Sequence, residues 1–190
     1  RGRFFTEVLD KLLPDGKLAA AHLLARAVRF PTIGELYYGG INSQGYIIKS
    51  NPDLKSEKSF SKDFTITRFI GKDGEARLTF FEDDVDDAIA SQTNYYTNVT
   101  NFQNVDEVRT RGVELALNKR RFLIDGLGIF TNVAWTDAEI VRNDNVPDSV
   151  GKTFPRVPEW RVKCVLDYAP TEHWFLTFAA HYSSKQYGTL

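Results

Sequence analysis

The strongest constraint on the fold of this chain is the alternation of large apolar residues with small or polar ones over residues 105–135. The large apolar positions in this stretch include Val113, Leu115, Leu117, Leu127, Ile129, Val133 and Trp135. A period of two sends successive side chains to opposite faces of a β-strand. A charged segment ending in Asp125-Gly126 separates the two runs, and both residues of this dipeptide tolerate the positive φ of a turn. The pattern predicts a hairpin with one apolar face, typical of a sheet between lipid and water.

The C-terminal part of the sequence repeats this alternation between aromatic residues. Trp160 and Tyr168 bracket one apolar run, and Trp174 and Tyr182 bracket the next. About nine residues separate the bracketing rings, which is the length of a tilted transmembrane strand, and rings at both ends suit the two membrane interfaces. We predict a curved antiparallel sheet whose convex side carries Val113, Leu115, Leu117, Val133, Trp135, Val162, Leu166, Leu176 and Phe178.

Eight segments have strand-like patterns, and their connections alternate in length. The predicted strands cover residues 3–9, 17–29, 56–70, 75–81, 112–118, 127–135, 160–168 and 174–182, with a helical turn over 32–36 and loops over 82–101 and 137–159. Antiparallel strands place alternate connections at opposite ends, so tight turns should lie at one end and long loops at the other. The predicted fold class is all-β: an antiparallel up-and-down meander of about eight strands, a partial arc of a large transmembrane β-barrel. Residues 3–9 and 174–182 are expected at open edges.

The composition argues against several other functions. Lys and Arg number 24 and Asp and Glu number 25, so the near-neutral balance gives no reason to expect nucleic acid as a partner. The single cysteine, Cys164, cannot form an internal disulfide and fits the apolar face as a small hydrophobe. His22, His173 and His181 are too scattered to propose a ligand set, and no nucleophile motif is recognisable. We predict no enzyme activity, no catalytic residues, no cofactor and no metal site.

An acidic cluster follows the predicted strand over residues 75–81. Asp83, Asp84, Asp86 and Asp87 could bind a hard cation such as calcium through their oxygens, but the cluster lacks the glycine and the terminal glutamate of a calcium-binding loop. We therefore expect these carboxylates at a solvated strand end near the rim of the sheet.

Several segments, taken in order, make the sequence resemble a known family. They read RAVRFPTIGELY (26–37), NPDLK (51–55), FFEDDVDDAI (80–89), RTRGVEL (109–115), GK (151–152) and PRVP (155–158). In their order and spacing the chain resembles the barrel of TonB-dependent outer-membrane receptors of the ferric-siderophore type. The resemblance implies that residues 1–190 are the C-terminal part of a barrel of about 22 strands, without the plug domain and the closing C-terminal strands.

The resemblance also implies the location and partners of the full receptor. These receptors lie in the outer membrane of Gram-negative bacteria, among outer-membrane lipid and lipopolysaccharide. They import a ferric siderophore, haem, cobalamin or a similar metal complex with energy from the TonB complex, which engages the plug domain. Haem receptors of the family commonly have a histidine in the loop before an Asn-Pro-Asn-Leu-like segment, and residues 31–51 contain none. A ferric siderophore is therefore the expected cargo, with the others as alternatives.

Five tyrosines in the predicted long connections are the candidate ligand-binding residues: Tyr37, Tyr38, Tyr46, Tyr95 and Tyr96. A phenol ring combines apolar area for stacking with a polar tip. These rings could stack on an aromatic siderophore, or instead mark the outer interface or pack loop against loop. A soluble all-β binding module is a second interpretation, although its core would have to bury Glu114, Asn118, Asn132, Lys163 and Asp167 at a high cost. A barrel-type outer-membrane enzyme is a third, for which no catalytic constellation is found.

Overall fold

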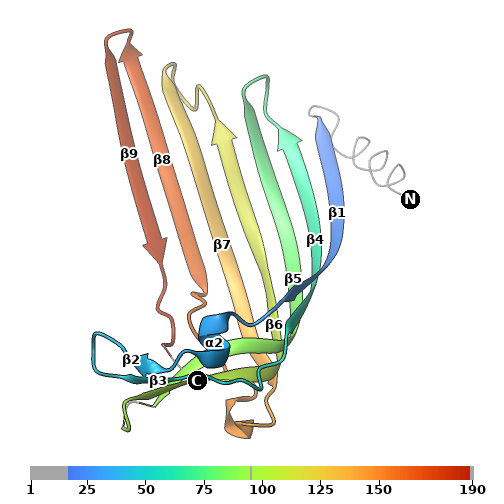
Figure 1. The fold of residues 1–190 in the computed structure, drawn as a ribbon. Helices are drawn as coiled ribbons and strands as arrows, with labels where there is room; N and C mark the ends of the chain where they lie inside the picture. The colour runs from blue at the N-terminus through green and yellow to red at the C-terminus, as the bar shows by residue number, and fades with distance from the viewer. Residues whose placement is uncertain (1–16, 95, 189–190) are drawn as a thin grey trace.

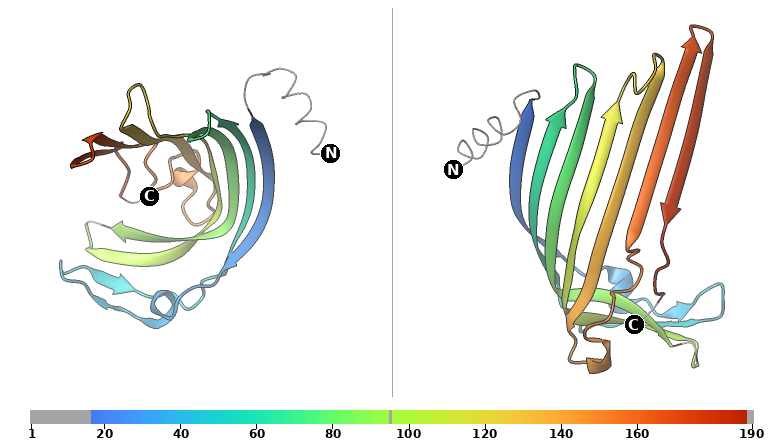
Figure 2. Two further views of the ribbon diagram at one scale, coloured as in Figure 1. Left: turned by 90° about the horizontal axis from the view of Figure 1, so that it is seen from above. Right: turned by 180° about the vertical axis from the view of Figure 1, so that it is seen from behind.

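One antiparallel sheet dominates the computed structural model, which describes residues 17–94 and 96–188. Seven long strands lie side by side in the order β1-β4-β5-β6-β7-β8-β9. Their bounds are Leu18–Arg29 (β1), Glu57–Phe69 (β4), Gly74–Asn94 (β5), Val99–Lys119 (β6), Leu127–Arg142 (β7), Trp160–Thr171 (β8) and Trp174–Ser183 (β9). The sheet curves into an open arc (Figures 1 and 2). The predicted all-β meander is confirmed, and a single sheet excludes the two stacked sheets of a soluble sandwich.

The connections at the two ends of the sheet differ, as predicted. The β4–β5, β6–β7 and β8–β9 connections lie together at the upper end in Figure 1. At the lower end, residues 30–56 carry the helix α2 (Ile33–Tyr37) and the short strands β2 (Gly40–Ile41) and β3 (Ile47–Lys49), and residues 143–159 carry the 3-10 helix η1 (Pro147–Ser149). The helical turn expected over 32–36 is confirmed. No helix in the described part of the chain is long and apolar enough to cross a membrane.

The edges of the sheet were predicted in part. β9 is one edge of the described sheet, as expected for residues 174–182, and β1 is the other. The strand predicted over residues 3–9 lies outside the described residues. Within the described part of the chain, the unpaired sides of β1 and β9 therefore present free backbone donors and acceptors.

Two segments predicted as loops are strands, which corrects the sequence-based interpretation. β5 and β6 are 21 residues long each, so most of residues 82–101 form a tall ribbon, and β7 continues to Arg142. Polar side chains pair across the ribbon: Thr93 Oγ1 lies 2.9 Å from Thr100 Oγ1, and Gln103 Nε2 donates to Gln92 Oε1 at 2.9 Å. The ladder continues past the apolar alternation because such cross-strand polar pairs stabilise it.

Strand register places the large apolar residues on one face of the sheet. One row runs across five strands, in which Phe64 pairs with Phe80, Phe80 with Val113, Val113 with Trp135 and Trp135 with Trp160. Other cross-strand pairs on this face are Leu115–Val133, Val133–Val162, Leu117–Thr131, Leu166–Phe178 and Tyr168–Leu176. The residues predicted to share a face therefore do so.

The same face is the convex one. Residues 143–159 lie inside the arc when the sheet is viewed from above (Figure 2, left), and Phe154 of this segment packs against a buried cluster that contains Val108 and Ile140. Val108 and Ile140 form a cross-strand pair with the opposite parity to Val113 and Trp135. The concave face is therefore that of Val108 and Ile140, and the predicted convex set is confirmed.

The described residues bury only a small core, which lies at the long-loop end. Ala88, Val105, Val108 and Ile140 form it, with Val85, Ala90 and Phe154 packed against them. β5 and β6 bend near this point (Figure 1), where Asp87 has a φ of 54° and the β6–β7 register shifts between Glu107 and Val108. On the convex face, by contrast, large side chains such as Leu115 and Phe80 remain exposed. An exposed apolar face of this extent requires an apolar environment.

Candidate functional site

The connection formed by residues 30–56 begins with a capped helix. Thr32 Oγ1 accepts a hydrogen bond from Glu35 N at 3.2 Å, and Thr32 N donates to Glu35 Oε2 at 2.7 Å, which forms a reciprocal capping box. Arg29, the last residue of β1, donates to both carboxylate oxygens of Glu35 at 3.2–3.3 Å. Burial alone would raise the pKa of Glu35, but the hydrogen bonds from Arg29 and Thr32 outweigh burial and lower this pKa. The start of α2 is thus fixed to the end of β1.

The same connection is then attached to the β5–β6 ribbon. β3 pairs in parallel with β6, and Ile47 N donates to Asn98 O at 2.8 Å. Asn104 of β6 exchanges two hydrogen bonds with the backbone of Lys55: its Oδ1 accepts from Lys55 N at 2.9 Å, and its Nδ2 donates to Lys55 O at 3.1 Å. Asn51 Nδ2 donates to Phe102 O at 3.1 Å. Residues 30–56 and the tip of the ribbon therefore form one unit, which we call the loop assembly.

The structure places four of the five candidate tyrosines on the loop assembly. Tyr37 ends α2, Tyr38 follows it, Tyr46 precedes β3, and Tyr96 lies in the turn that joins β5 to β6. The exposed fractions of Tyr37, Tyr38 and Tyr96 are 67%, 70% and 101%, whereas Tyr46 is half-buried. Tyr95 lies outside the described residues. The three exposed rings are open to a ligand that approaches from the long-loop end.

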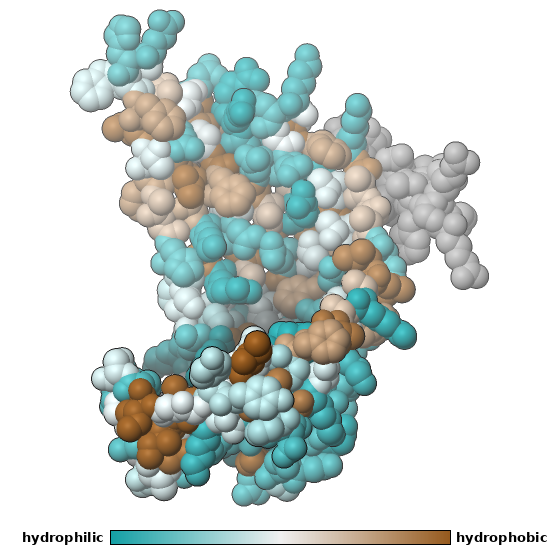
Figure 3. Space-filling model, viewed as in Figure 1, coloured by the Kyte–Doolittle hydropathy of each residue, from teal (hydrophilic) through white to brown (hydrophobic). Residues whose placement is uncertain are grey.

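Apolar side chains add to this aromatic area. Ile33, Ile41 and Ile47 are exposed on the loop assembly, and Figure 3 shows a hydrophobic patch at the lower left, where β2 and β3 lie in Figure 1. A surface with exposed phenol rings beside aliphatic side chains suits a ligand with an aromatic or apolar part.

A charged row lies next to the apolar row on the convex face. Two residues beyond Phe64, Phe80, Val113 and Trp135 on their strands come Lys62, Glu82, Arg111 and Asp137, which are also cross-strand partners. The signs of the charges alternate along this row. The convex face therefore changes from apolar to charged within about 7 Å, the length of two residues in a strand.

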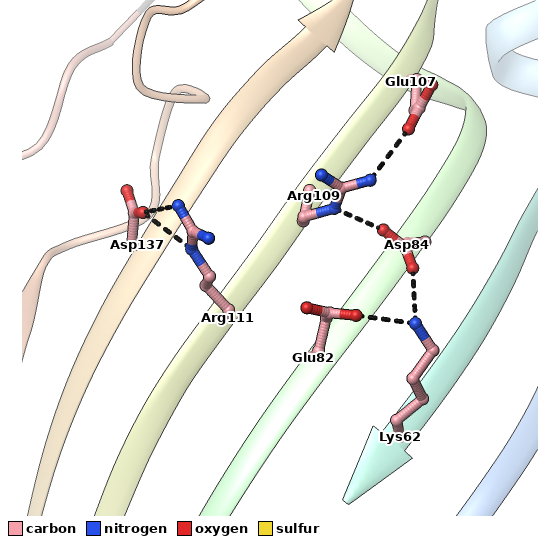
Figure 4. Close-up of polar contacts among 7 residues, drawn as sticks. All are labelled: Lys62, Glu82, Asp84, Glu107, Arg109, Arg111 and Asp137. Atoms are coloured by element: carbon pink, nitrogen blue, oxygen red, sulfur yellow. Dashed lines mark hydrogen bonds and ion pairs between the residues drawn. The ribbon is translucent and has the colours of Figure 1, made fainter.

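Ion pairs connect the charged row to the next one (Figure 4). Lys62 Nζ donates to Glu82 Oε1 at 2.6 Å and to Asp84 Oδ2 at 3.1 Å. Arg109 Nε donates to Asp84 Oδ1 at 2.8 Å. Lys62 and Arg26 also lie 5.3 Å from the ring centroid of Phe60. The charged row is thus held by contacts between strands, and because these side chains remain solvated each pair adds little to stability.

The acidic cluster identified in the sequence lies inside β5 and not at a strand end, which corrects that prediction. Asp84 sits between Lys62 and Arg109, and the Asp87 carboxylate lies 3.5 Å from Lys55 Nζ. In the described part of the chain, no group of three or more His, Cys, Asp or Glu residues is arranged to hold a metal ion. The cationic partners lie more than twenty residues away in the sequence, so inspection of the cluster alone could not reveal them.

The concave face carries paired polar residues. Asn132 Nδ2 donates to Glu114 Oε1 at 2.6 Å, and Thr177 Oγ1 donates to Asp167 Oδ1 at 2.7 Å. None of these four side chains is fully buried. This face therefore suits contact with water or with a polar protein surface, and its polar residues do not carry the cost expected for the core of a soluble module.

The family of the chain follows from this geometry together with a match to a family model. An antiparallel arc with an apolar convex face, a polar concave face and long loops at one end defines a segment of a transmembrane β-barrel. The family model described as "TonB dependent receptor-like, beta-barrel" matches residues 19–190, and the chain belongs to this family. The family comprises transport receptors of the Gram-negative outer membrane. No protein of curated function matches the sequence significantly.

Solved structures of receptors with different cargo share the fold. The copper transporter OprC is 21% identical with a TM-score of 0.61. The match covers 81% of this chain and 22% of the OprC chain. A mutant of the ferric enterobactin receptor PfeA from Pseudomonas aeruginosa, in complex with enterobactin, is 22% identical with a TM-score of 0.62. The match covers 90% of this chain and 26% of the PfeA chain. A double mutant of the Serratia marcescens hemophore receptor HasR, in complex with its hemophore HasA and heme, is 14% identical with a TM-score of 0.59. The match covers 87% of this chain and 30% of the HasR chain. The chain thus spans 22–30% of the length of these three receptors.

Proposed function

We propose that this chain is part of the barrel wall of a TonB-dependent importer of a ferric siderophore in the outer membrane of a Gram-negative bacterium. In this proposal residues 1–190 form the C-terminal part of the barrel, and the plug domain and closing strands belong to other parts of the receptor. The plug domain would engage the TonB complex. Family membership supports the transport class, and the cargo class is argued from the loop assembly.

The observation that carries the cargo proposal is the exposure of Tyr37, Tyr38 and Tyr96 on one anchored loop assembly. Aromatic rings stack with about 0.5–1.5 kcal/mol per ring beyond the area that they bury. Because the assembly is fixed to β6 by backbone pairing and by Asn104, little conformational entropy is lost when a ligand binds. Residues 31–51 offer no histidine for a haem iron, which favours a siderophore over haem.

The convex face supports a definite depth of the wall in the membrane. We place the outer hydrocarbon boundary between the row of Phe80 and Trp135 and the row of Glu82 and Asp137, because charge is costly in hydrocarbon and aromatic rings favour the interface. Trp174 and Tyr168, near the tight-turn end, would mark the inner interface. The loop assembly then lies outside the cell, where cargo arrives, and the outward-facing charges meet outer-membrane lipid headgroups and lipopolysaccharide.

The test uses the full-length receptor in a strain that lacks other iron importers. We expect ferric siderophores to restore growth, and replacement of Tyr37, Tyr38 and Tyr96 by alanine to weaken siderophore binding by about tenfold or more. Phenylalanine at the same positions is the matched control, because it keeps the rings and should retain most of the affinity. Growth on haem, cobalamin or copper alone, with no ferric siderophore used, would assign the receptor to another cargo. Unchanged binding by the alanine variant would remove the tyrosines from the site.

A further inference from the structure

Two basic side chains project from the concave face of β8. In the strand register Arg161 is opposite Ala134 of β7, and Lys163 is opposite Asn132. Ala134 and Asn132 lie an even number of residues from Ile140 on β7, so they share its concave face. Arg161 and Lys163 therefore point into the arc, about 7 Å apart along the strand, and both are exposed.

The neighbouring strands place no carboxylate beside either cation. On β9 the cross-strand partner of Arg161 is Ser183 and that of Lys163 is His181, and on β7 both partners are uncharged. Within the described part of the chain, neither the Arg161 guanidinium nor the Lys163 ammonium has an ion pair or a hydrogen bond. Two like charges thus stand next to each other without a counter-charge from the wall, which is unfavourable.

Other charged side chains on the concave face or just before β8 have partners within the wall. These pairs are Arg77 with Glu75, Arg29 with Glu57, Asn132 with Glu114, Thr177 with Asp167 and Trp135 with Glu159. The carboxylates around Arg161 and Lys163 are therefore held by other donors. A counter-charge for these two cations has to come from outside the wall.

The interior of the barrel is the side from which this counter-charge comes, because the strands on both sides of β8 are described. Arg161 lies in the row of Ala134, directly below the row of Trp135 at the proposed outer hydrocarbon boundary. It therefore faces the lumen at membrane depth. Barrels of about 22 strands have a plugged lumen, so at this depth the concave face meets protein.

We propose that the concave face of β8 docks an acidic surface of the plug domain, whose carboxylates contact Arg161 and Lys163. The planar fork of a guanidinium binds a carboxylate through two parallel hydrogen bonds, and an ammonium adds a point charge beside it. Small side chains, Ala134 and Ser183, flank Arg161, so a protein surface can approach it closely. A passing cargo would leave both charges unpaired in the resting receptor, whereas a plug domain pairs them permanently.

The direct test is a zero-length carbodiimide cross-link on the full-length receptor in detergent, without cargo. The reagent joins a lysine amine to a carboxylate that touches it, and peptide mass spectrometry identifies the partners. We expect Lys163 to be linked to an Asp or Glu of the plug domain. Lys62, whose Nζ lies 2.6 Å from Glu82 Oε1, is the internal positive control. If Lys62 is linked while Lys163 is unlinked, or linked only to the barrel, the proposal is wrong.

Hydrogen exchange of the plug domain provides a second test. The double variant Arg161→Gln and Lys163→Gln should raise the exchange rate of the docked plug segment about three- to tenfold, as expected for the loss of two solvated ion pairs. Exchange of the barrel strands should be unchanged, which shows that the variant folds. Arg77→Gln is the matched control, because the partner of Arg77 is Glu75 of the wall, and it should leave plug exchange unchanged.

The outcomes separate this docking surface from other roles of the two cations. Unchanged plug exchange in the double variant together with weaker cargo uptake would assign Arg161 and Lys163 to the passing cargo and overturn the proposal. The inference rests on the proposed function only in that it requires a plug domain. Neither measurement uses a siderophore, so an error in the cargo class would appear in the growth test and leave both results unaffected.

Discussion

Arg111 and Asp137 face each other across β6 and β7, and Arg111 donates two hydrogen bonds to Asp137 Oδ2, at 3.3 Å from Nε and at 3.2 Å from Nη2. The next pair toward the tight-turn end is Val113 with Trp135, after the Gly112–Thr136 pair of the opposite face. The ion pair therefore lies two residues beyond the apolar row, on the side of the long loops. Arg111 and Val113, two residues apart on the same face of β6, thus lie on opposite sides of the proposed hydrocarbon boundary.

The first prediction tests the depth of the wall. Leu115→Arg should destabilise the full-length receptor in lipid bilayers by about 2–4 kcal/mol. Leu115 lies on the apolar convex face, inside the proposed hydrocarbon boundary, where a charge meets hydrocarbon. Ala116→Arg is the control, since Ala116 has the opposite parity and faces the concave side. Denaturant titration in bilayers gives both free energies of unfolding. Equal costs at the two positions would contradict the assignment of the convex face to lipid.

The second prediction concerns Gly112, which forms a close contact between β5, β6 and β7. A Cβ at Gly112 would overlap the backbone oxygen of Trp135 and lie 2.5 Å from the ring of Phe81. Gly112→Ala should therefore destabilise the sheet by about 1–3 kcal/mol through overpacking. Adding Phe81→Ala should recover only part of the loss, because the backbone oxygen cannot move aside as a side chain can. Full recovery in the double variant would show that the ring alone makes glycine necessary.

The third prediction is a pH dependence of the start of α2. The pKa of Glu35 is lowered in the folded protein, so its contribution to stability is present above the ordinary carboxyl pKa of 4.5 and is lost as the pH falls through the folded value below it. Hydrogen exchange of residues 30–38, corrected for the intrinsic rate, should increase as the pH falls below 4.5. Glu35→Gln should exchange faster at neutral pH and lose this pH dependence. A wild type with unchanged protection at low pH would speak against a role for the ionised carboxylate.

The fourth prediction tests whether the loop assembly is preformed. Asn104→Ala removes the two hydrogen bonds with Lys55 and a third, from Nδ2 to Asp87 O at 2.7 Å. We expect residues 50–56 to lose about 1–3 kcal/mol of local stability and to be cleaved faster by proteases. Siderophore affinity should fall although no tyrosine is changed, because the loops must then be ordered on binding. Thr93→Ala, farther along the ribbon, is the control and should leave proteolysis of residues 50–56 unchanged.

The sequence was informative wherever one face of a strand is apolar. Val113 to Leu117 and Ile129 to Trp135 show a period of two because only the convex face is apolar there, so hairpins and faces could be predicted. Residues 82–94 of β5 were missed because acidic residues dominate their first half and the irregularity at Asp87 interrupts the period of two, so Val85 is out of phase with Ala88 and Ala90 although the three pack in one cluster. The pairing of Glu82 with Lys62 and of Asp84 with Arg109 depends on register between strands, which a single sequence does not contain.

The candidate site was predictable only in its residue types. Tyrosines in long connections could be named from the sequence, but the parallel pairing of β3 with β6 that gathers them has no local signal. The same holds for residues 155–158: the two prolines indicate a break in the ladder, whereas the hydrogen bond from Arg156 N to Tyr187 O depends on the path of the C-terminal tail.

The alternating row of Lys62, Glu82, Arg111 and Asp137 also determines how the wall responds to salt. Neighbouring charges lie on strands about 4.8 Å apart, which is less than the screening length of about 8 Å at physiological ionic strength. Opposite charges at this spacing cancel at distances well beyond about 5 Å, so the row acts on headgroups in direct contact with it and produces almost no field farther away. The depth of the wall in the bilayer should therefore be nearly independent of ionic strength, because long-range attraction between the row and charged lipids is negligible.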